Sequence, residues 1–183
     1  MIVKQIVLSL LLLVVMFFPL RVVYGLLAFM FKKNKSAMYV SSFARHIRLM
    51  KDHLKLLPWK RLVDLWCGDG KAMRFFAKEF ALQCDGYELQ RVPYYYGKTL
   101  NSLLWYSKLT LYKQDFSQAS LGRYDYIYLY LLPQQMADIE PRIFENIKIG
   151  ALVISNSFQF VLHKPYKVIE NSKGKASIFL YKK

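Results

Sequence analysis

Two carboxylates and a glycine-containing loop form the part of this sequence best suited to bind a ligand. An apolar run that starts at Leu62 meets the carboxylate Asp64, and a short loop with Gly68 and Gly70 follows. Glycine at such a loop lets the backbone approach a bound molecule closely. A second carboxylate, Glu88, ends the next apolar run. Because an acid at the end of the second strand of a nucleotide-binding sheet can bind ribose hydroxyls, the pattern indicates a cofactor that carries an adenosine.

Each acid also has a purely structural interpretation. Asp64 could cap the turn and hold the loop through backbone hydrogen bonds, and Glu88 could be a solvated strand end. Asp69, inside the loop, could be the N-cap of the helix that follows, which suits it as well as ligand binding does. We favour ligand binding for Asp64 and Glu88 and leave both roles open for Asp69.

Strands that alternate with helices are expected after residue 36 and would position these groups. Helical spacing of apolar residues predicts an amphipathic helix over 42–57, which Pro58 ends. Further helices are predicted at 71–80, 92–106 and 134–147, and strands at 61–66, 83–88, 109–113, 124–132 and 151–155. The continuous apolar and aromatic run at 124–132 is typical of a central strand buried on both faces.

This alternation predicts an α/β fold with a doubly wound, mostly parallel sheet. Two last apolar stretches, 166–170 and 177–181, flank a turn-forming segment and predict a C-terminal antiparallel hairpin. The hairpin is a departure from a plain dinucleotide-binding fold.

Charge is distributed unevenly along the 183 residues, a length that suits one domain. The net charge is +15, and residues 1–51 hold eight Lys or Arg and no acid. The rest of the chain still has an excess of seven positive charges, which favours an anionic neighbour such as a membrane surface or an acidic partner. No basic-aromatic motif of a known nucleic-acid reader is present, so no nucleic-acid partner is expected.

The two cysteines, Cys67 and Cys84, fall in predicted strand or loop segments. Two are too few for the disulfide framework of a small secreted domain, so we expect both to be small buried hydrophobic residues. A zinc site would need more ligands than these cysteines and three scattered histidines offer, so no metal is expected.

The N-terminal segment is predicted to cross a membrane. Residues 2–20 are almost all apolar and long enough to span a bilayer, and a second apolar stretch at 22–31 ends in a cluster of lysines. The lysines predict a single-pass anchor with the rest of the chain on the cytoplasmic or equivalent side. We therefore expect a membrane anchor with a basic flank over 1–35 and a folded domain over 36–183.

Two questions about this segment stay open. Residues 22–31 could lie in the membrane interface or continue a tilted helix. A cleaved signal peptide is the competing interpretation, but its positive region would consist of Lys4 alone and no small-residue cleavage site follows. We favour the uncleaved anchor.

From about Met38 to Pro165 the chain resembles the class I S-adenosylmethionine-dependent methyltransferases, which have a Rossmann-like fold. A narrower resemblance is to the group that includes the lysine methyltransferases of the ATP synthase c-subunit and of the adenine nucleotide translocase. Four segments fall in the order seen in that group: 63–71, 86–89, 105–108 and 132–136. Its members are also membrane-associated through an N-terminal apolar segment, and the short stretch that follows it there, here 38–42, lacks the usual proline.

The resemblance implies S-adenosylmethionine as the cofactor and assigns roles to residues. The loop after the first strand would approach the methionine part of the cofactor, Glu88 would hold the ribose, and Asp115 or its neighbour Phe116 would contact the adenine. The implied cofactor-binding residues are Asp64, Leu65, Trp66, Gly68, Gly70, Glu88, Leu89, Asp115 and Phe116. Asp115 also suits ordinary turn chemistry at a strand exit.

The chain departs from the family pattern at Trp66, where the loop normally has glycine. An indole at this position could crowd the methionine part of the site, which makes a non-catalytic cofactor-binding scaffold the alternative from another functional class. Asp64, Gly68, Gly70 and Glu88 are retained and favour an active enzyme.

Methyl transfer to an amine chiefly needs positioning and a neutral nucleophile, and burial beside apolar groups lowers the pKa of a lysine. We expect the acceptor to enter near Leu131, Leu132 and Pro133, because open α/β sheets bind ligands at the carboxyl ends of their strands. The leading hypothesis is a membrane-anchored enzyme that methylates a lysine of a membrane protein. Methylation of a lipid or a quinone-like molecule is the second, and the oligomeric state stays open.

Overall fold

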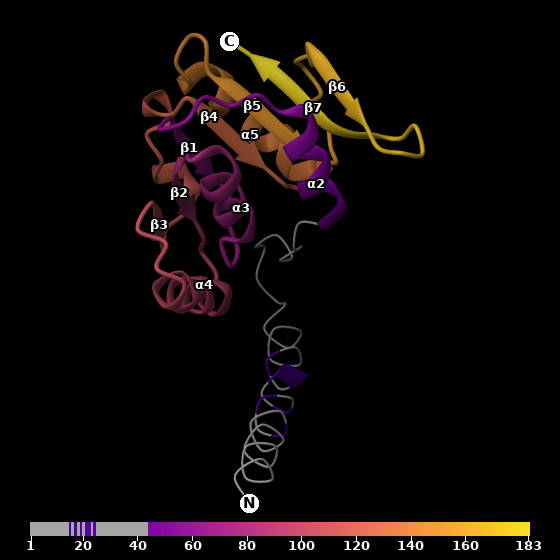
Figure 1. Ribbon diagram of the computed structural model, residues 1–183. Coiled ribbons are helices and arrows are strands. Elements are labelled where there is room, and N and C mark those ends of the chain that lie inside the picture. The colour runs from indigo at the N-terminus through magenta and orange to yellow at the C-terminus, as the bar shows by residue number, and fades with distance from the viewer. Residues whose placement is uncertain (1–14, 16, 18, 20, 23, 25–43) are drawn as a thin grey trace, which may run out of the picture. The chain divides into compact units, whose positions relative to one another are not determined.

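The computed structural model describes residues 44–183, together with 15, 17, 19, 21, 22 and 24 (Figure 1). The predicted span at 2–20, the stretch at 22–31 and the segment 38–42 therefore lie largely or wholly outside the described residues. Within the part that is described, no helix combines the length and the apolar character needed to cross a membrane. The chain divides into two units, Met1–Met38 and Tyr39–Lys183, and all elements named below belong to the second.

A seven-stranded sheet runs through the described part of the second unit in the order β3-β2-β1-β4-β5-β7-β6. Strands β1 to β5 are parallel to one another, whereas β7 is antiparallel to both β5 and β6. The strands are β1 Arg61–Asp64, β2 Gln83–Tyr87, β3 Leu109–Tyr112, β4 Tyr126–Leu129, β5 Leu152–Asn156, β6 Lys167–Glu170 and β7 Ala176–Lys182. The predicted parallel sheet with a C-terminal antiparallel pair is confirmed.

Helices cover both faces of the sheet (Figure 1). They are α2 Ala44–His53, α3 Lys71–Phe80, α4 Arg91–Leu103 and α5 Pro133–Asn146, with two short 3-10 turns, η1 Phe116–Gln118 and η2 Leu121–Arg123. Side chains of α5 pack on one face in a core cluster that includes Ile127 and Leu129 of β4. Those of α2 and α3 pack on the other face with Tyr126 and Tyr128. Alternate residues of β4 thus enter opposite cores, as a strand buried on both faces requires.

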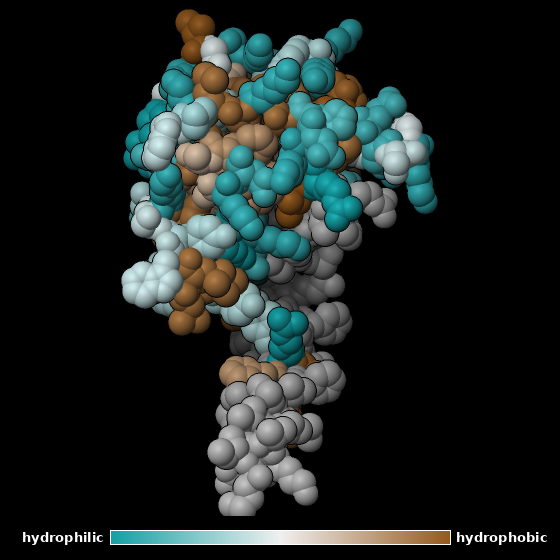
Figure 2. Space-filling view, in the orientation of Figure 1, coloured by the Kyte–Doolittle hydropathy of each residue, from teal (hydrophilic) through white to brown (hydrophobic). Residues whose placement is uncertain are grey.

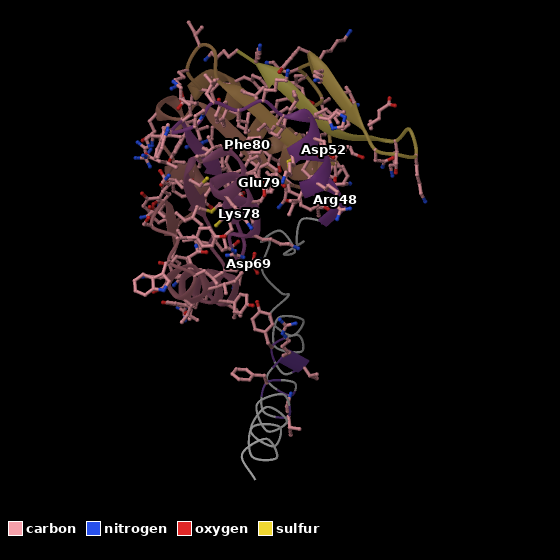
Figure 3. The ribbon with its side chains drawn as sticks, in the orientation of Figure 1. Arg48, Asp52, Asp69, Lys78, Glu79 and Phe80 are labelled. Carbon is pink, nitrogen blue, oxygen red and sulfur yellow. The ribbon has the colours of Figure 1, made fainter. Side chains whose placement is uncertain are left out.

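Helix α3 is held against α2 by polar as well as apolar contacts. Phe76 is fully buried, and burial of such a ring contributes about 1.5–3 kcal/mol. Lys51 of α2 also lies 2.7 Å from the carboxylate of Glu79, which Figure 3 shows on α3.

The cysteines agree with the prediction, since Cys67 and Cys84 are both buried and not disulfide-bonded. Burial raises the pKa of both thiols.

Several elements are shorter than their sequence pattern predicts, because local hydrogen bonds or backbone turns limit them. Strand β4 begins after Tyr124, because the amide of Tyr124 completes η2 by donating to the carbonyl of Leu121. Strand β1 stops at Asp64, where the amide of Trp66 turns back to the Asp64 carboxylate. Helix α4 ends at Leu103, and Trp105 adopts left-handed backbone with φ 54°.

Candidate functional site

The carboxyl edge of the parallel strands brings the predicted site residues to one region. Asp64 is the last residue of β1, Glu88 follows β2, and Asp115 follows β3 by three positions. The register places Asp64 beside Gly86 on one side and Tyr128 on the other. Since parallel strands all end at the same edge, groups more than 50 residues apart in sequence become neighbours.

The loop between β1 and α3 is a tight turn that depends on glycine. Gly68 and Gly70 have φ of 55° and 77°, in the left-handed region that glycine adopts without steric strain. The amide of Gly70 donates to the carbonyl of Cys67 at 2.8 Å, and the amide of Cys67 donates to the carbonyl of Tyr87 at 3.0 Å. The loop is therefore fixed both to itself and to the end of β2.

Glu88 ties this loop to the start of α4. One carboxylate oxygen accepts from the amide of Gly68 at 3.0 Å, and the other accepts from the amide of Gln90 at 2.6 Å. The side chain is buried, and burial raises the pKa of this carboxyl although both amide bonds oppose the shift. Because each carboxylate oxygen has two lone pairs, Glu88 keeps acceptor capacity for ribose hydroxyls while it holds the loop.

Asp64 is the most perturbed acid of the site. Its carboxylate accepts from the amide of Trp66 at 3.2 Å, and the residue is 2% exposed. Its pKa is raised from 3.8 to about 7, mainly by burial and to a smaller extent by the nearby carboxylates of Glu88 and Asp69, although the bond from the Trp66 amide opposes the shift. Three acids in one corner favour a ligand that carries positive charge, since a cation would offset both the burial and the mutual repulsion.

Asp69 is engaged by the protein itself at the start of α3 (Figure 3). Its carboxylate accepts from the amide of Lys71 at 3.0 Å and lies 3.4 Å from the guanidinium of Arg74. Arg74 also donates to the Asp69 carbonyl at 2.6 Å and to the side-chain oxygen of Asn101 at 2.8 Å. These bonds show the structural role that the sequence left open, although the N-cap position itself is Gly70.

Helix α4 packs so closely on the loop that only glycine fits at position 97. A Cβ atom built there would lie 2.6 Å from the carbonyl oxygen of Asp69. Arg74, Gly97 and Asn101 thus support the loop from α3 and α4, and sequence reasoning missed all three. The one signal was Gly97 itself, a glycine within a helical pattern.

Trp66 is partly buried and packs against the core cluster to which the side chains of α5 contribute. Its ring lies 5.4 Å from that of Phe116, so two residues implied to bind the cofactor contact each other. Within the described part of the chain, the indole Nε1 is buried and has no hydrogen-bond partner. The neighbouring Asp115 accepts from the amide of Ser117 at 2.7 Å and so caps η1.

The remaining predicted residues differ in what they can offer a ligand. The side chain of Leu65 is buried in the core, which leaves only its backbone, whereas Leu89 is half exposed at the site edge. At the predicted acceptor entry, Leu131 is buried, Leu132 is exposed and Pro133 begins α5. Residues 131–133, here called the acceptor lip, therefore place an exposed apolar side chain at the carboxyl end of β4.

A polar cluster that sequence reasoning missed lies on the same edge, between α2 and β5. The side-chain oxygen of Asn156 is 2.7 Å from Nδ1 of His46, and its Nδ2 donates to the hydroxyl of Tyr128 at 2.9 Å. Ser157, the next residue, has φ 73° and contacts the same Asn156 oxygen at 3.1 Å. The signal was the run of polar residues that ends the apolar strand, but its partners come from distant segments.

The residues of this edge fit S-adenosylmethionine. The acid corner matches a cofactor with positive charge and ribose hydroxyls, and the positive-φ glycines allow close backbone approach. In the described part of the chain, Asn101 Nδ2 is also buried without a hydrogen-bond partner, and it would lie 3.6 Å from a Cβ atom at Gly70. Unpaired donors beside the loop suit the carboxylate and base acceptors of such a ligand.

Comparison with known proteins agrees with this geometry. The ANTKMT methyltransferase domain family matches residues 64–167. No match was found among curated proteins.

Solved methyltransferases share the fold. An RNA methyltransferase of Salinibacter ruber, in complex with S-adenosylhomocysteine, is 19% identical with a TM-score of 0.71, covering 78% of this chain and 93% of its own. Phosphoethanolamine N-methyltransferase 2 of Haemonchus contortus has 19% identity and a TM-score of 0.58, with 73% and 32% covered. A Geobacter sulfurreducens enzyme has 15% identity and a TM-score of 0.55, with 62% and 48% covered. The chain thus spans nearly all of the first protein and less than half of the other two.

Proposed function

Because this chain belongs to the ANTKMT methyltransferase family and is an S-adenosylmethionine-dependent methyltransferase, we propose that it methylates a lysine side chain of a membrane protein. The family match carries this proposal, since it extends over the loop at Asp64, Glu88 and the acceptor lip at Leu132. The lysine and membrane parts of the proposal go beyond the match and rest on the residues at the carboxyl ends of β4 and β5 and on the N-terminal sequence.

The cofactor supplies a methyl group bound to a positively charged sulfur. Asp64 and Glu88 provide negative charge and acceptor oxygens for binding, and the glycine loop lets backbone amides come close. Phe116 adds apolar surface where the adenine is expected, and its ring contacts that of Trp66 from the loop. These groups fix the orientation of the reactive methyl, which is the main contribution an enzyme makes to an in-line displacement.

The acceptor side combines the acceptor lip with a polar cluster. The exposed Leu132 would lie against the alkyl chain of a lysine, and apolar surroundings favour the neutral amine by lowering its pKa. His46 and Asn156, from α2 and β5, contact each other at 2.7 Å, and we propose that this pair would orient the amine by hydrogen bonds. This pairing suits a long apolar chain with a polar tip better than a wholly apolar substrate.

The membrane part of the proposal rests on the sequence. An apolar segment of spanning length followed by lysines suits a single-pass anchor, with the catalytic domain on the cytoplasmic or equivalent side. Anchoring would raise the effective concentration of substrates in the same bilayer. We therefore propose a membrane-embedded protein as the target.

Transfer of tritiated methyl groups into membrane fractions tests the proposal. Wild-type protein should label a protein band whose hydrolysate contains methylated lysine, and Glu88→Ala should abolish the label. Label extracted with lipid would support the second hypothesis instead. A folded protein that binds S-adenosylmethionine but labels neither fraction would support the non-catalytic scaffold suggested by Trp66.

A further inference from the structure

Large exposed hydrophobic side chains concentrate on and beside α4. Residues 89–105 contribute more of them than any other stretch of comparable length in the described second unit (Figure 2). They are Leu89, Val92, Tyr95, Tyr96, Leu103, Leu104 and Trp105. Monomeric soluble proteins scatter such residues singly, whereas a contiguous group marks an interaction surface.

The end of α4 is the most exposed part of this group and has a defined shape. Leu103 is 70% exposed and Trp105 is 91% exposed. The amide of Leu104 donates to the carbonyl of Leu100 at 3.0 Å, and that of Trp105 donates to Ser102 at 3.2 Å. These backbone bonds hold the apolar tip in one conformation, so its exposure is a built feature of the fold.

The charge of this region has a single sign. Residues 89–113 contain no Asp or Glu, and four cations lie among the exposed rings: Arg91, Lys98, Lys108 and Lys113. The ammonium group of Lys113 lies 5.7 Å from the ring centre of Tyr95, and that of Lys108 lies 3.9 Å from that of Trp59. A cavity of about 450 Å³ between α4 and β3 is lined by Lys98, Ser102, Trp105 and their neighbours.

We propose that this α4 face, defined as the seven hydrophobic and four cationic residues above, docks on the surface of a bilayer that contains anionic phospholipids. Tryptophan and tyrosine favour the headgroup region, leucine and valine favour the acyl boundary, and lysine and arginine attract anionic lipid. A single-stranded nucleic acid would use the rings and cations but would leave the aliphatic side chains exposed. The contact goes beyond methyl transfer and does not depend on the N-terminal anchor.

The position of the face gives the contact a consequence for the enzyme. Helix α4 begins three residues after Glu88, and Leu89 belongs to both the face and the predicted cofactor site. Docking would hold the cofactor end of α4 close to the headgroups. Substrate residues that emerge from the same bilayer would then be within reach of the carboxyl edge.

Depth-dependent quenching in nanodiscs tests the proposal on the full chain. Because both native cysteines are buried, single cysteines introduced by Leu103→Cys or Ile149→Cys can be labelled selectively with a fluorophore. Ile149 is the matched control, since it is an 88% exposed aliphatic residue in the turn before β5. Nanodiscs of phosphatidylcholine with about 30% phosphatidylserine would carry a nitroxide lipid as quencher.

The probe at position 103 should be quenched at least about threefold more strongly than the probe at 149. Adding Lys98→Glu and Lys108→Glu, or removing phosphatidylserine, should reduce that difference. Equal quenching at both positions would overturn the proposal, as would protection of the 103 probe by RNA or by a second copy of the chain without lipid quenching. Unchanged binding of S-adenosylhomocysteine by the charge-reversed variant would show that the fold and the cofactor site are intact.

Discussion

Replacing Asp64 with asparagine should make the ligand-free protein more stable while it weakens cofactor binding. The carboxylate is 2% exposed, and its pKa rises from 3.8 to about 7, with burial as the largest cause. A folded carboxyl with a raised pKa binds its proton more tightly than the unfolded chain does. Wild-type stability therefore falls as the pH rises through the window between these two values, and no further above it.

The expected size follows from the shift. The pKa rises by about three units, and each unit corresponds to about 1.36 kcal/mol, which gives about 4 kcal/mol in the free energy of unfolding. The wild type keeps this stability at about pH 4 and has lost it at about pH 8. Asparagine keeps an acceptor for the Trp66 amide and carries no charge. The variant should thus match the wild type near pH 4 and exceed it near pH 8 by a few kcal/mol.

Urea unfolding in mild detergent, followed by tryptophan fluorescence, would measure both free energies. Asp138→Asn, at an exposed position of α5, is the matched control and should change stability by less than about 0.5 kcal/mol. Calorimetry should show that Asp64→Asn weakens S-adenosylhomocysteine binding by about tenfold or more. The reasoning is refuted if the variant gains no stability between the two pH values relative to the wild type, or if it binds the cofactor normally.

Three further variants test other parts of the site. Glu88→Ala should weaken S-adenosylmethionine binding by at least about tenfold in calorimetry, because the loop amide at Gly68 and the ribose both lose their acceptor; unchanged affinity would remove Glu88 from the site. Gly97→Ala, which would ordinarily stabilise a helix by about 1 kcal/mol, should instead destabilise the fold by about 1–3 kcal/mol in urea unfolding, whereas exposed Ser102→Ala should not; a stabilised Gly97→Ala would contradict the close packing. Glu140→Gln should speed hydrogen exchange at the amides of residues 161–163 and cost about 1–3 kcal/mol, because the buried carboxylate accepts from all three amides and from the His163 ring. Those partners lower the pKa of Glu140, so the extra stability of the wild type over Glu140→Gln should disappear as the pH falls below the usual range of a glutamate. A difference in stability that persists in acid would contradict the role given to the Glu140 carboxylate.

The fold was readable from the sequence because its signals are local. Alternation of strand and helix patterns predicted the parallel sheet, and the turn-flanked stretches at 166–170 and 177–181 predicted the antiparallel pair. The order of the last strands was not local information. Strand β7 inserts between β5 and β6 because its buried side chains enter both cores, a property of the assembled sheet.

Element ends were harder to predict than element types. The apolar run at 124–132 continues past both ends of β4, since Tyr124 completes a 3-10 turn and Leu131 packs in the core outside the strand. Hydrophobic patterns report burial, and burial does not distinguish a strand residue from a loop residue that packs beside it.

The sequence by itself determined the chemistry at the first two strand ends. Asp64, Gly68, Gly70 and Glu88 carry a local pattern, because a short turn with positive φ needs glycine and a strand end presents its side chain at the sheet edge. Only the tertiary structure decided what surrounds them. The contact of Gly97 with the loop joins segments of one sheet edge that are far apart in sequence.

The same division holds for the two features with the largest functional consequences. The His46–Asn156 contact spans 110 positions, and Asp64, whose pKa burial raises, lies between Gly86 of β2 and Tyr128 of β4. Sequence patterns report what each segment prefers over a few residues. Desolvation, mutual charge and orientation depend on which distant segments the fold brings together, so only the folded chain could supply them.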